Sequence, residues 1–364
     1  MDVNKVAFII CSNDHQYLDE CRKYIEVLIV PEGMTTEIIP VIGAKSMCAG
    51  YNTGMRSTDA LYKVYLHQDT FILNQNLISD FIQAFNEDEK IGMLGVVGCT
   101  DLPMDALCFT EWNIGSILQC NGYSVKKHRE FQNEEISYVW AVDGCLIITK
   151  TDLPWREDVF DGWDFYDISQ GMEFTEAGHR VAVPYQKEPW CFHDCGILNL
   201  DTYDKSRNIF CDTYSKYFKY SETEEHKEKK RQDREDVAKA REVSAEIRKL
   251  YDSGKYMEAI YEVKKCREYK NKDNEFFSIF AVSSIILEEW KAGKDYFAKD
   301  RCDTDTLIKK YRELRFALFR MENGIESGNN LREALEKGNV SMEALTVLIE
   351  AFVYDKEKVY GLLT

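Results

Sequence analysis

The stretch Val64-Tyr65-Leu66-His67-Gln68-Asp69-Thr70-Phe71-Ile72-Leu73 contains an apolar run that stops at three polar residues and then resumes. The apolar run predicts a buried strand, and burying polar side chains at its end costs free energy. Such residues are typical of strand ends that meet a ligand at the carboxyl edge of an α/β sheet. His67 and Asp69 would suit a divalent cation that holds a diphosphate. The alternative is an edge strand that enters an Asx-type turn, with both side chains in water.

Short apolar runs alternate with helical stretches through residues 1–205, which predicts an α/β domain with a mainly parallel sheet and right-handed crossovers. We predict strands at Val6–Cys11, Thr36–Ile42, Val64–Leu66, Met93–Val97, Ser137–Ala141, Cys145–Thr149 and Arg180–Pro184. We predict helices at Tyr17–Val27, Met47–Thr58 and Asn76–Phe85.

The pattern changes after this domain. Residues 206–242 are predicted to form a charged helical linker, because Glu and Lys are mixed at helical spacing from 221 to 241. Residues 243–364 read as helical throughout. The segment Leu250–Ile260 resembles the inner turn of a tetratricopeptide repeat, and Trp290–Ala298 echoes it. We expect a helical-repeat domain that binds a protein partner or mediates oligomerisation, with a generic helical bundle as the alternative.

Composition excludes several classes of function. The 364 residues predict two domains, and 45% hydrophobic content is ample for packed cores. A net charge of −17 argues against binding to nucleic acid or to an anionic membrane. No apolar run is long enough to cross a bilayer, and Met1–Lys5 has no signal-peptide pattern.

The twelve cysteines are expected to be reduced. Several lie within apolar runs, where a reduced cysteine behaves as a small hydrophobe, and we therefore expect a cytoplasmic protein. Cys191 and Cys195 flank His193, but no second ligand pair with zinc-site spacing follows, which disfavours structural zinc.

Polar residues follow the first two predicted strands. Ser12-Asn13-Asp14 could bond a nucleotide base or ribose, or could simply cap the next helix. Lys45 and Ser46 follow the second strand, and Lys45 could neutralise a phosphate. Asn52 would point towards the same strand ends. The glycines at 50 and 54 are as readily explained by close packing of a helix on the sheet.

Carboxylates and one histidine lie further along the chain. Asp143, Asp164 and Asp167 form a plausible acid/base and acceptor platform, because nearby aromatic rings would raise a carboxyl pKa and stack on sugars. Asp167 begins a predicted helix, whose dipole would oppose that rise, and an N-cap is the rival role for Asp164 and Asp167. His193 resembles a packed core histidine, but neutral imidazole ligates divalent metals well, and Asp69 needs a partner.

Together these segments resemble the family-two-like glycosyltransferases with the GT-A fold, most closely a bacterial subgroup with His-Gln-Asp in place of Asp-x-Asp. The resemblance covers about residues 5–200. The segments that carry it are Phe8–Asn13, Gly43–Ser46 with Tyr51-Asn52, Tyr65–Asp69, Ile91–Gly98, Gly162–Ile168 and His193.

The resemblance implies a nucleotide-diphosphate sugar donor, with a UDP-sugar favoured, and a cation, Mn²⁺ or Mg²⁺. Asp69 would ligate the cation, His193 would complete its shell, and His67 would contact the nucleotide or the metal. The implied donor-binding residues are Ser12, Asn13, Asp14, Lys45, Ser46, Asn52, His67 and Gln68. The family usually reads uracil with an Asp after its second strand, where this chain has Ile42-Gly43.

The same resemblance implies a hexosyltransferase that inverts the anomeric carbon. Counting back from Gly178 selects Asp167 as the base, with Tyr166 where the family more often has Glu and Asp164 as the alternative. Asp143 would position the acceptor, a glycan or a protein. Two other functions stay open: a catalytically silent scaffold that keeps the sugar-nucleotide fold, and a nucleotidyltransferase, which usually needs more metal-binding carboxylates than this strand end offers.

Overall fold

The computed structural model describes residues 1–106, 112–120, 125–129, 135–195, 202–219, 224–265 and four short pieces between 312 and 325. Its contacts divide the chain into two units, described separately below.

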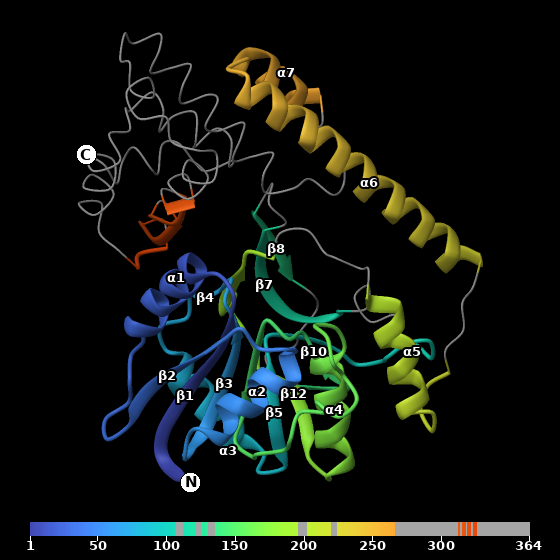
Figure 1. The fold of residues 1–364 in the computed structure, drawn as a ribbon. Coiled ribbons are helices and arrows are strands. Elements are labelled where there is room, and N and C mark those ends of the chain that lie inside the picture. Colours follow the sequence, from blue (N-terminus) through green and yellow to red (C-terminus); the bar gives the residue numbers. More distant parts are fainter. Residues whose placement is uncertain are drawn as a thin grey trace. The chain divides into compact units, whose positions relative to one another are not determined.

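The larger unit is built on a seven-stranded mixed sheet, in the order β2-β1-β3-β11-β5-β12-β9 (Figure 1). Its strands are β1 (Asp2–Ser12), β2 (Thr35–Ile42), β3 (Ala60–His67), β5 (Ile91–Gly95), β9 (Ser137–Val139), β11 (Leu146–Thr149) and β12 (Arg180–Val183). β1 pairs in parallel with β2 and β3, and β12 pairs in parallel with β5. β9 and β11 run antiparallel to their neighbours. The predicted α/β class is confirmed.

Helices cover both faces of this sheet. On one face, α2 (Met47–Arg56), α4 (Tyr166–Glu176) and α5 (Tyr203–Thr213) share one hydrophobic core with the sheet, and α2 and α4 lie in front of it in Figure 1. On the other face, α3 (Leu77–Glu87) packs Phe81 and Phe85 on Tyr62 of β3, with ring centroids 5.4 and 6.0 Å apart. The side chains of Tyr62 and Tyr65 point to opposite faces because strand side chains alternate.

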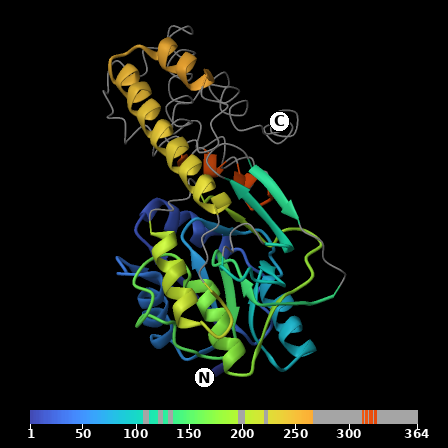
Figure 2. The ribbon, with the colours of Figure 1, turned by 90° about the vertical axis from the view of Figure 1, so that its right-hand side faces the viewer.

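A second sheet, built from short strands, was not predicted. It has the order β10-β6-β7-β13-β4, and β8 pairs with β7 (Figure 2). Its members are β4 (Thr70–Ile72), β6 (Val97–Cys99), β7 (Ile114–Cys120), β8 (Val125–Arg129), β10 (Ala141–Val142) and β13 (Cys191–His193).

Two predicted strands therefore split between the sheets. The run Met93–Val97 divides at Val96, where the chain leaves β5 for β6, and a side chain at Gly95 would overlap Val142. The run Ser137–Ala141 divides into β9 and β10. Apolar sequence alone marked both runs as continuous, because it does not show where a chain changes sheets.

The remaining helix of the larger unit, α1 (His15–Glu26), begins at an Asp14 cap. The Asp14 carboxylate accepts hydrogen bonds from the backbone N–H groups of Gln16 and Tyr17, at 2.9 and 3.3 Å. This cap satisfies two of the free N–H groups of the first turn. Tyr24 of α1 stacks on Phe71 of β4 with ring centroids 5.0 Å apart.

The first domain was predicted to end at residue 205, and that boundary stays a prediction. Phe210, Cys211 and Tyr214 of α5 and its flank lie in the core of the larger unit, whose contacts continue to Thr223. The second unit then contains α6 (Glu224–Asp252), which covers the later part of the predicted linker, from 224 to 242, and continues ten residues past its end.

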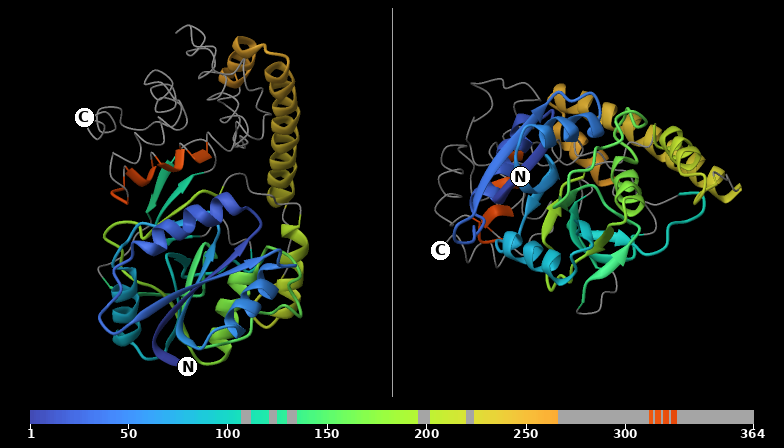
Figure 3. Two further views of the ribbon diagram at one scale, coloured as in Figure 1. Left: turned by 60° about the vertical axis from the view of Figure 1, so that its left-hand side comes forward. Right: turned by 90° about the horizontal axis from the view of Figure 1, so that it is seen from below.

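In the second unit, α6 packs against α7 (Tyr256–Lys265), and Gly254 turns the chain between them with a φ of +74° (Figure 3). This helix pair coincides with the predicted repeat-like turn at Leu250–Ile260. The predicted second copy, Trp290–Ala298, lies outside the described residues. Within the described segments, every helix is too short or too polar to cross a bilayer.

Candidate active site

The His-Gln-Asp segment lies where the chain passes from the first sheet to the second. His67 is the last residue of β3, Gln68 and Asp69 form the turn, and Thr70 begins β4. β13 pairs antiparallel with β4, with Thr70 opposite His193. The backbone N–H of Asp194 also donates to the Asp69 carbonyl, at 2.9 Å. The polar triplet is therefore held beside His193 by backbone pairing.

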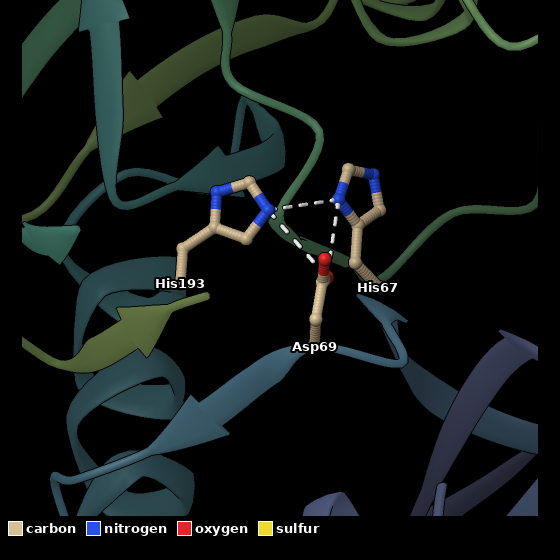
Figure 4. A group of neighbouring side chains, drawn as sticks. All are labelled: His67, Asp69 and His193. Carbon is tan, nitrogen blue, oxygen red and sulfur yellow. Dashed lines mark hydrogen bonds and ion pairs between the residues drawn. The ribbon is translucent and has the colours of Figure 1, made fainter. Parts of the chain in front are cut away.

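Three donor atoms converge at this point (Figure 4). Nδ1 of His67 lies 3.3 Å from Nε2 of His193, which lies 3.5 Å from Oδ1 of Asp69. The distance from His67 Nδ1 to Asp69 Oδ1 is 3.9 Å. The side chains of His67 and Asp69 are 22% and 23% exposed, so the group opens to solvent on one side.

These distances fit a bound divalent cation. Two donors bonded to one ion at about 2.0–2.2 Å lie roughly 2.8–3.1 Å apart in cis-octahedral geometry and roughly 3.3–3.6 Å apart in tetrahedral geometry. Two of the three distances fall in the tetrahedral range, and the third exceeds it by a few tenths of an ångström. Imidazole nitrogen and carboxylate oxygen are both accepted ligands of first-row divalent metals.

A second group of donors lies next to the first and shares His193 with it. The carboxylate of Asp143 and the thiol of Cys145 lie within 4.8 Å of each other and of a His193 nitrogen. Burial raises the pKa of the Cys145 thiol well above its usual value. Because the thiolate is the metal-binding form, this group is the weaker candidate.

The pKa values of His67, Asp69 and His193 depend on one another. Burial alone would lower the pKa of His193, but the negative charge of Asp69 and its hydrogen bond raise that pKa to about 9. His193 and His67 in turn lower the pKa of Asp69, against the effect of burial. Burial and the neighbouring His193 lower the pKa of His67. Asp69 is therefore ionised at neutral pH, as a metal ligand must be.

Asp143 directly precedes Gly144 in the chain, and Asp167 is hydrogen-bonded to the Gly144 backbone. The Asp167 carboxylate accepts hydrogen bonds from the backbone N–H groups of Gly144 and Ile168, each at 2.9 Å. Burial, followed by the charge of Asp143, raises the pKa of Asp167 to about 7. Desolvation therefore outweighs the backbone hydrogen bonds and the helix N-terminus, which favour the anion. A carboxyl group with this pKa is suited to act as a general base near neutral pH.

Asp164, the alternative base, is held differently. One of its oxygens accepts a hydrogen bond from the Thr202 hydroxyl at 2.5 Å, while burial raises its pKa. Its neighbour Phe165 adopts the left-handed backbone conformation, with a φ of +63°, at the start of α4. This conformation costs a bulky residue about 1–3 kcal/mol, and such strain often marks functional sites. The rival N-cap role for Asp164 is not observed, because Phe165 occupies the N-cap position.

The predicted donor-binding turn is tied to the His-Gln-Asp segment by Gln68. The side-chain carbonyl of Gln68 accepts hydrogen bonds from the Ser12 hydroxyl at 2.8 Å and from the backbone N–H groups of Asn13 and Asp14 at 3.0 and 2.9 Å. The Gln68 amide donates to Asn13 Oδ1, at 2.8 Å. The structure thus brings these four residues together beside the group of His67, Asp69 and His193.

The second predicted segment has mixed roles. Lys45 is exposed, whereas Ser46 is buried and caps α2 by accepting a hydrogen bond from the Ala49 N–H at 3.2 Å. Asn52 is 1% exposed, and its amide exchanges hydrogen bonds of 2.8 and 2.9 Å with the backbone of Trp155. Its amide groups are therefore used inside the core, and the expected contact of Asn52 with a donor stays a prediction.

Sequence reasoning noted Tyr166 as a departure from the resembled pattern but gave it no role. In the structure its hydroxyl is hydrogen-bonded to Nε2 of His67. The sequence signal that could have revealed this contact was the Tyr that stands where the family more often has Glu. A tyrosine side chain reaches further than a carboxylate from the same helix position.

A family model described as "Glycosyltransferase like family" matches residues 7–214. The matched segment contains every predicted site residue from Ser12 to His193. The chain belongs to this family. The protein is accordingly a glycosyltransferase, and the mixed sheet of its larger unit is consistent with a GT-A fold.

No curated protein is significantly similar to this glycosyltransferase. Among solved structures, S. aureus TarS 1-349 aligns over 94% of this chain and 90% of its own, with 9% identity and a TM-score of 0.36. A197 from STIV aligns over 50% of this chain and 81% of its own, with 10% identity and a TM-score of 0.30. Neither similarity is high enough to support a statement about substrate or mechanism.

Proposed function

We propose that this glycosyltransferase is metal-dependent and inverting, and that it moves a hexose from a nucleotide-diphosphate sugar to an acceptor hydroxyl of a glycan or protein. The observation that carries the proposal is the convergence of His67, Asp69 and His193, close to a carboxylate with a pKa near 7.

Asp69, His193 and His67 are the residues proposed to hold Mn²⁺ or Mg²⁺. When bound, the cation supplies Lewis-acid stabilisation of the charge that develops on the departing diphosphate. Asp69 supplies the negative charge of the site, and the two imidazoles supply neutral donors once His193 has lost its proton to solvent.

Asp167 is proposed as the base. Its carboxylate would accept the proton of the acceptor hydroxyl while that oxygen attacks the anomeric carbon, in a single displacement that inverts the carbon. Asp143, the residue before Gly144, would position the acceptor. Asp164 is the second candidate for the base, since its pKa is also raised but one of its oxygens is already bonded to Thr202.

Donor binding is assigned to the turn that Gln68 organises. Ser12, Asn13 and Asp14 would face the nucleoside, while Lys45 is exposed and free to neutralise a phosphate. A UDP-sugar remains the favoured donor. The helices of the second unit are proposed to contact a protein partner or a second copy, and the cytoplasmic location remains an expectation from the sequence.

A panel of nucleotide sugars tests the proposal. The wild-type enzyme should release nucleoside diphosphate from one donor with Mn²⁺ or Mg²⁺ present and not with a chelator. Asp167→Asn should lower the rate on the order of 10²–10⁴-fold. The matched control is Asp161→Asn, because Asp161 lies in the loop before α4, is 82% exposed and faces Lys205 at 3.7 Å. Binding of a donor with no turnover would instead support the silent scaffold.

A further inference from the structure

Tyr166 connects the metal-binding group to the helix that carries the base. It is the first residue of α4, is 4% exposed, and its hydroxyl is hydrogen-bonded to Nε2 of His67. Its ring packs against Tyr51 and Trp155, with centroids 5.9 and 6.2 Å away. The phenol is therefore fixed by packing, and its single polar atom meets the ring nitrogen of His67 that faces away from Asp69 and His193.

Gly144 makes room for this contact. A Cβ atom at position 144 would overlap the Tyr166 hydroxyl. The backbone N–H of Gly144 also donates to the carboxylate of Asp167, at 2.9 Å. One glycine thus allows Tyr166 to reach His67 and helps hold the neighbouring Asp167.

The contact between Tyr166 and His67 bears on which ring nitrogen of His67 carries the proton. A neutral imidazole has one ring nitrogen with a free lone pair and one that carries a proton. For Nδ1 of His67 to face a cation together with Asp69 and His193, the proton must lie on Nε2. An Nε2–H needs an acceptor in this site, and the oxygen of Tyr166 is placed to be that acceptor.

We propose that Tyr166 is a positioning residue, which holds His67 as the Nε2–H tautomer so that Nδ1 serves as the third ligand of the cation. This inference rests on the proposed metal dependence. It gives a role to the tyrosine that stands where the resembled family more often has Glu. Outer partners of this kind orient the ligand ring and typically contribute 10–100-fold to metal affinity.

Tyr51 provides a matched control. It is fully buried in the same aromatic cluster, and among the described residues its hydroxyl has no hydrogen-bond partner. Tyr51→Phe and Tyr166→Phe each remove one buried hydroxyl and leave the ring. Only the second variant removes a contact with His67.

The first experiment measures Mn²⁺ binding by electron paramagnetic resonance of the full chain. We expect Tyr166→Phe to weaken binding by about 10- to 100-fold and Tyr51→Phe to change it less than about twofold. Equal affinities for the wild type and Tyr166→Phe would overturn the inference and leave the proposed metal dependence intact. If the wild type binds Mn²⁺ no better than Asp69→Asn does, the metal site itself fails.

A second measurement uses the wild-type protein alone, in case Tyr166→Phe does not fold. The ¹⁵N chemical shifts of the ring of His67, assigned with His67→Asn and recorded with Mg²⁺ or Zn²⁺, report which nitrogen carries the proton. A proton on Nε2 is the expected result. A proton on Nδ1 in the metal-loaded protein would overturn the proposal.

Discussion

Oδ1 of Asp69 lies 3.5 Å from Nε2 of His193, and the relationship is fixed by the backbone. Thr70 of β4 is paired with His193 of β13, and the Asp194 N–H donates to the Asp69 carbonyl at 2.9 Å. Both side chains are thus placed by strand register rather than by a mobile loop. A site built on paired strands keeps its ligand spacing without a cation, which reduces the cost of binding one.

The first prediction concerns Asp69. Asp69→Ala should lower metal-dependent turnover by at least about 100-fold, because it removes the charged ligand and leaves two imidazoles that repel a cation when protonated. Far-UV circular dichroism should be unchanged. Asp19→Ala, a carboxylate on the exposed side of α1, serves as the control and should keep full turnover. Sugar transfer by Asp69→Ala at the parental rate would show that the metal site is wrongly assigned.

The second prediction is the pH dependence of turnover. The general base must be ionised, and the pKa of Asp167 is about 7. At saturating donor and cation, kcat should therefore fall about tenfold per pH unit below that value. In Asp167→Asn the residual rate should lose this acidic limb. An unchanged acidic limb in Asp167→Asn would transfer the role of base to another group, with Asp164 the next to test.

The third prediction concerns stability. The pKa of Asp167 is raised in the folded protein from 3.8 to about 7, so the folded state holds the proton more tightly than the unfolded state does. Between pH 4 and pH 7 the unfolded state loses that proton first, and stability falls as pH rises. Above pH 7 the folded state carries the full free-energy cost of ionising the buried Asp167 carboxyl group, at most roughly 4 kcal/mol.

Asp167→Asn removes this titration. The Tm of the variant minus that of the wild type should therefore increase from pH 4 to pH 8, by several degrees. Scanning fluorimetry at five pH values measures the difference, and Asp161→Asn should give a flat line. A difference independent of pH would mean that Asp167 is not buried as described.

The fourth prediction separates packing from binding at Asn52. Asn52→Leu leaves the buried N–H and C=O of Trp155 without partners and should lower the free energy of unfolding by roughly 2–4 kcal/mol. Thr53→Ala, at the next and exposed position of α2, should change it by less than about 0.5 kcal/mol. Urea denaturation measures both. If Asn52→Leu is as stable as the wild type but binds the nucleotide sugar more weakly, Asn52 contacts the donor, as the sequence predicted.

Long, regular features were predictable from the sequence. The strands β1, β2 and β3 and the helices α1, α2 and α3 follow apolar patterns of ordinary length, and their ends are within a few residues of the prediction. The polar triplet after β3 also stood out in the sequence, since burial energy disfavours polar side chains there unless another interaction compensates, and its role as a metal site stays a prediction. Both conclusions rest on local sequence.

The unpredicted features depend on contacts distant in sequence. β4, β6 and β13 have three residues each, too few for a periodic pattern, and they form only because they pair with one another and with β7. The role of Gln68 as a brace for the Ser12-Asn13-Asp14 turn follows from the position of β3 beside β1. The contact between Tyr166 and His67 likewise requires the packing of α4 on the sheet. Most of α5 was assigned to the charged helical linker, because its sequence is polar overall.

A crystal soaked in Mn²⁺ and measured at the manganese absorption edge tests the central claim most directly. The account predicts an anomalous peak within about 2.0–2.4 Å of Asp69 Oδ1, His193 Nε2 and His67 Nδ1. The same soak of Asp69→Asn should lose the peak. A wild-type crystal with manganese bound elsewhere, or with these three side chains free of it at saturating concentration, would contradict the account.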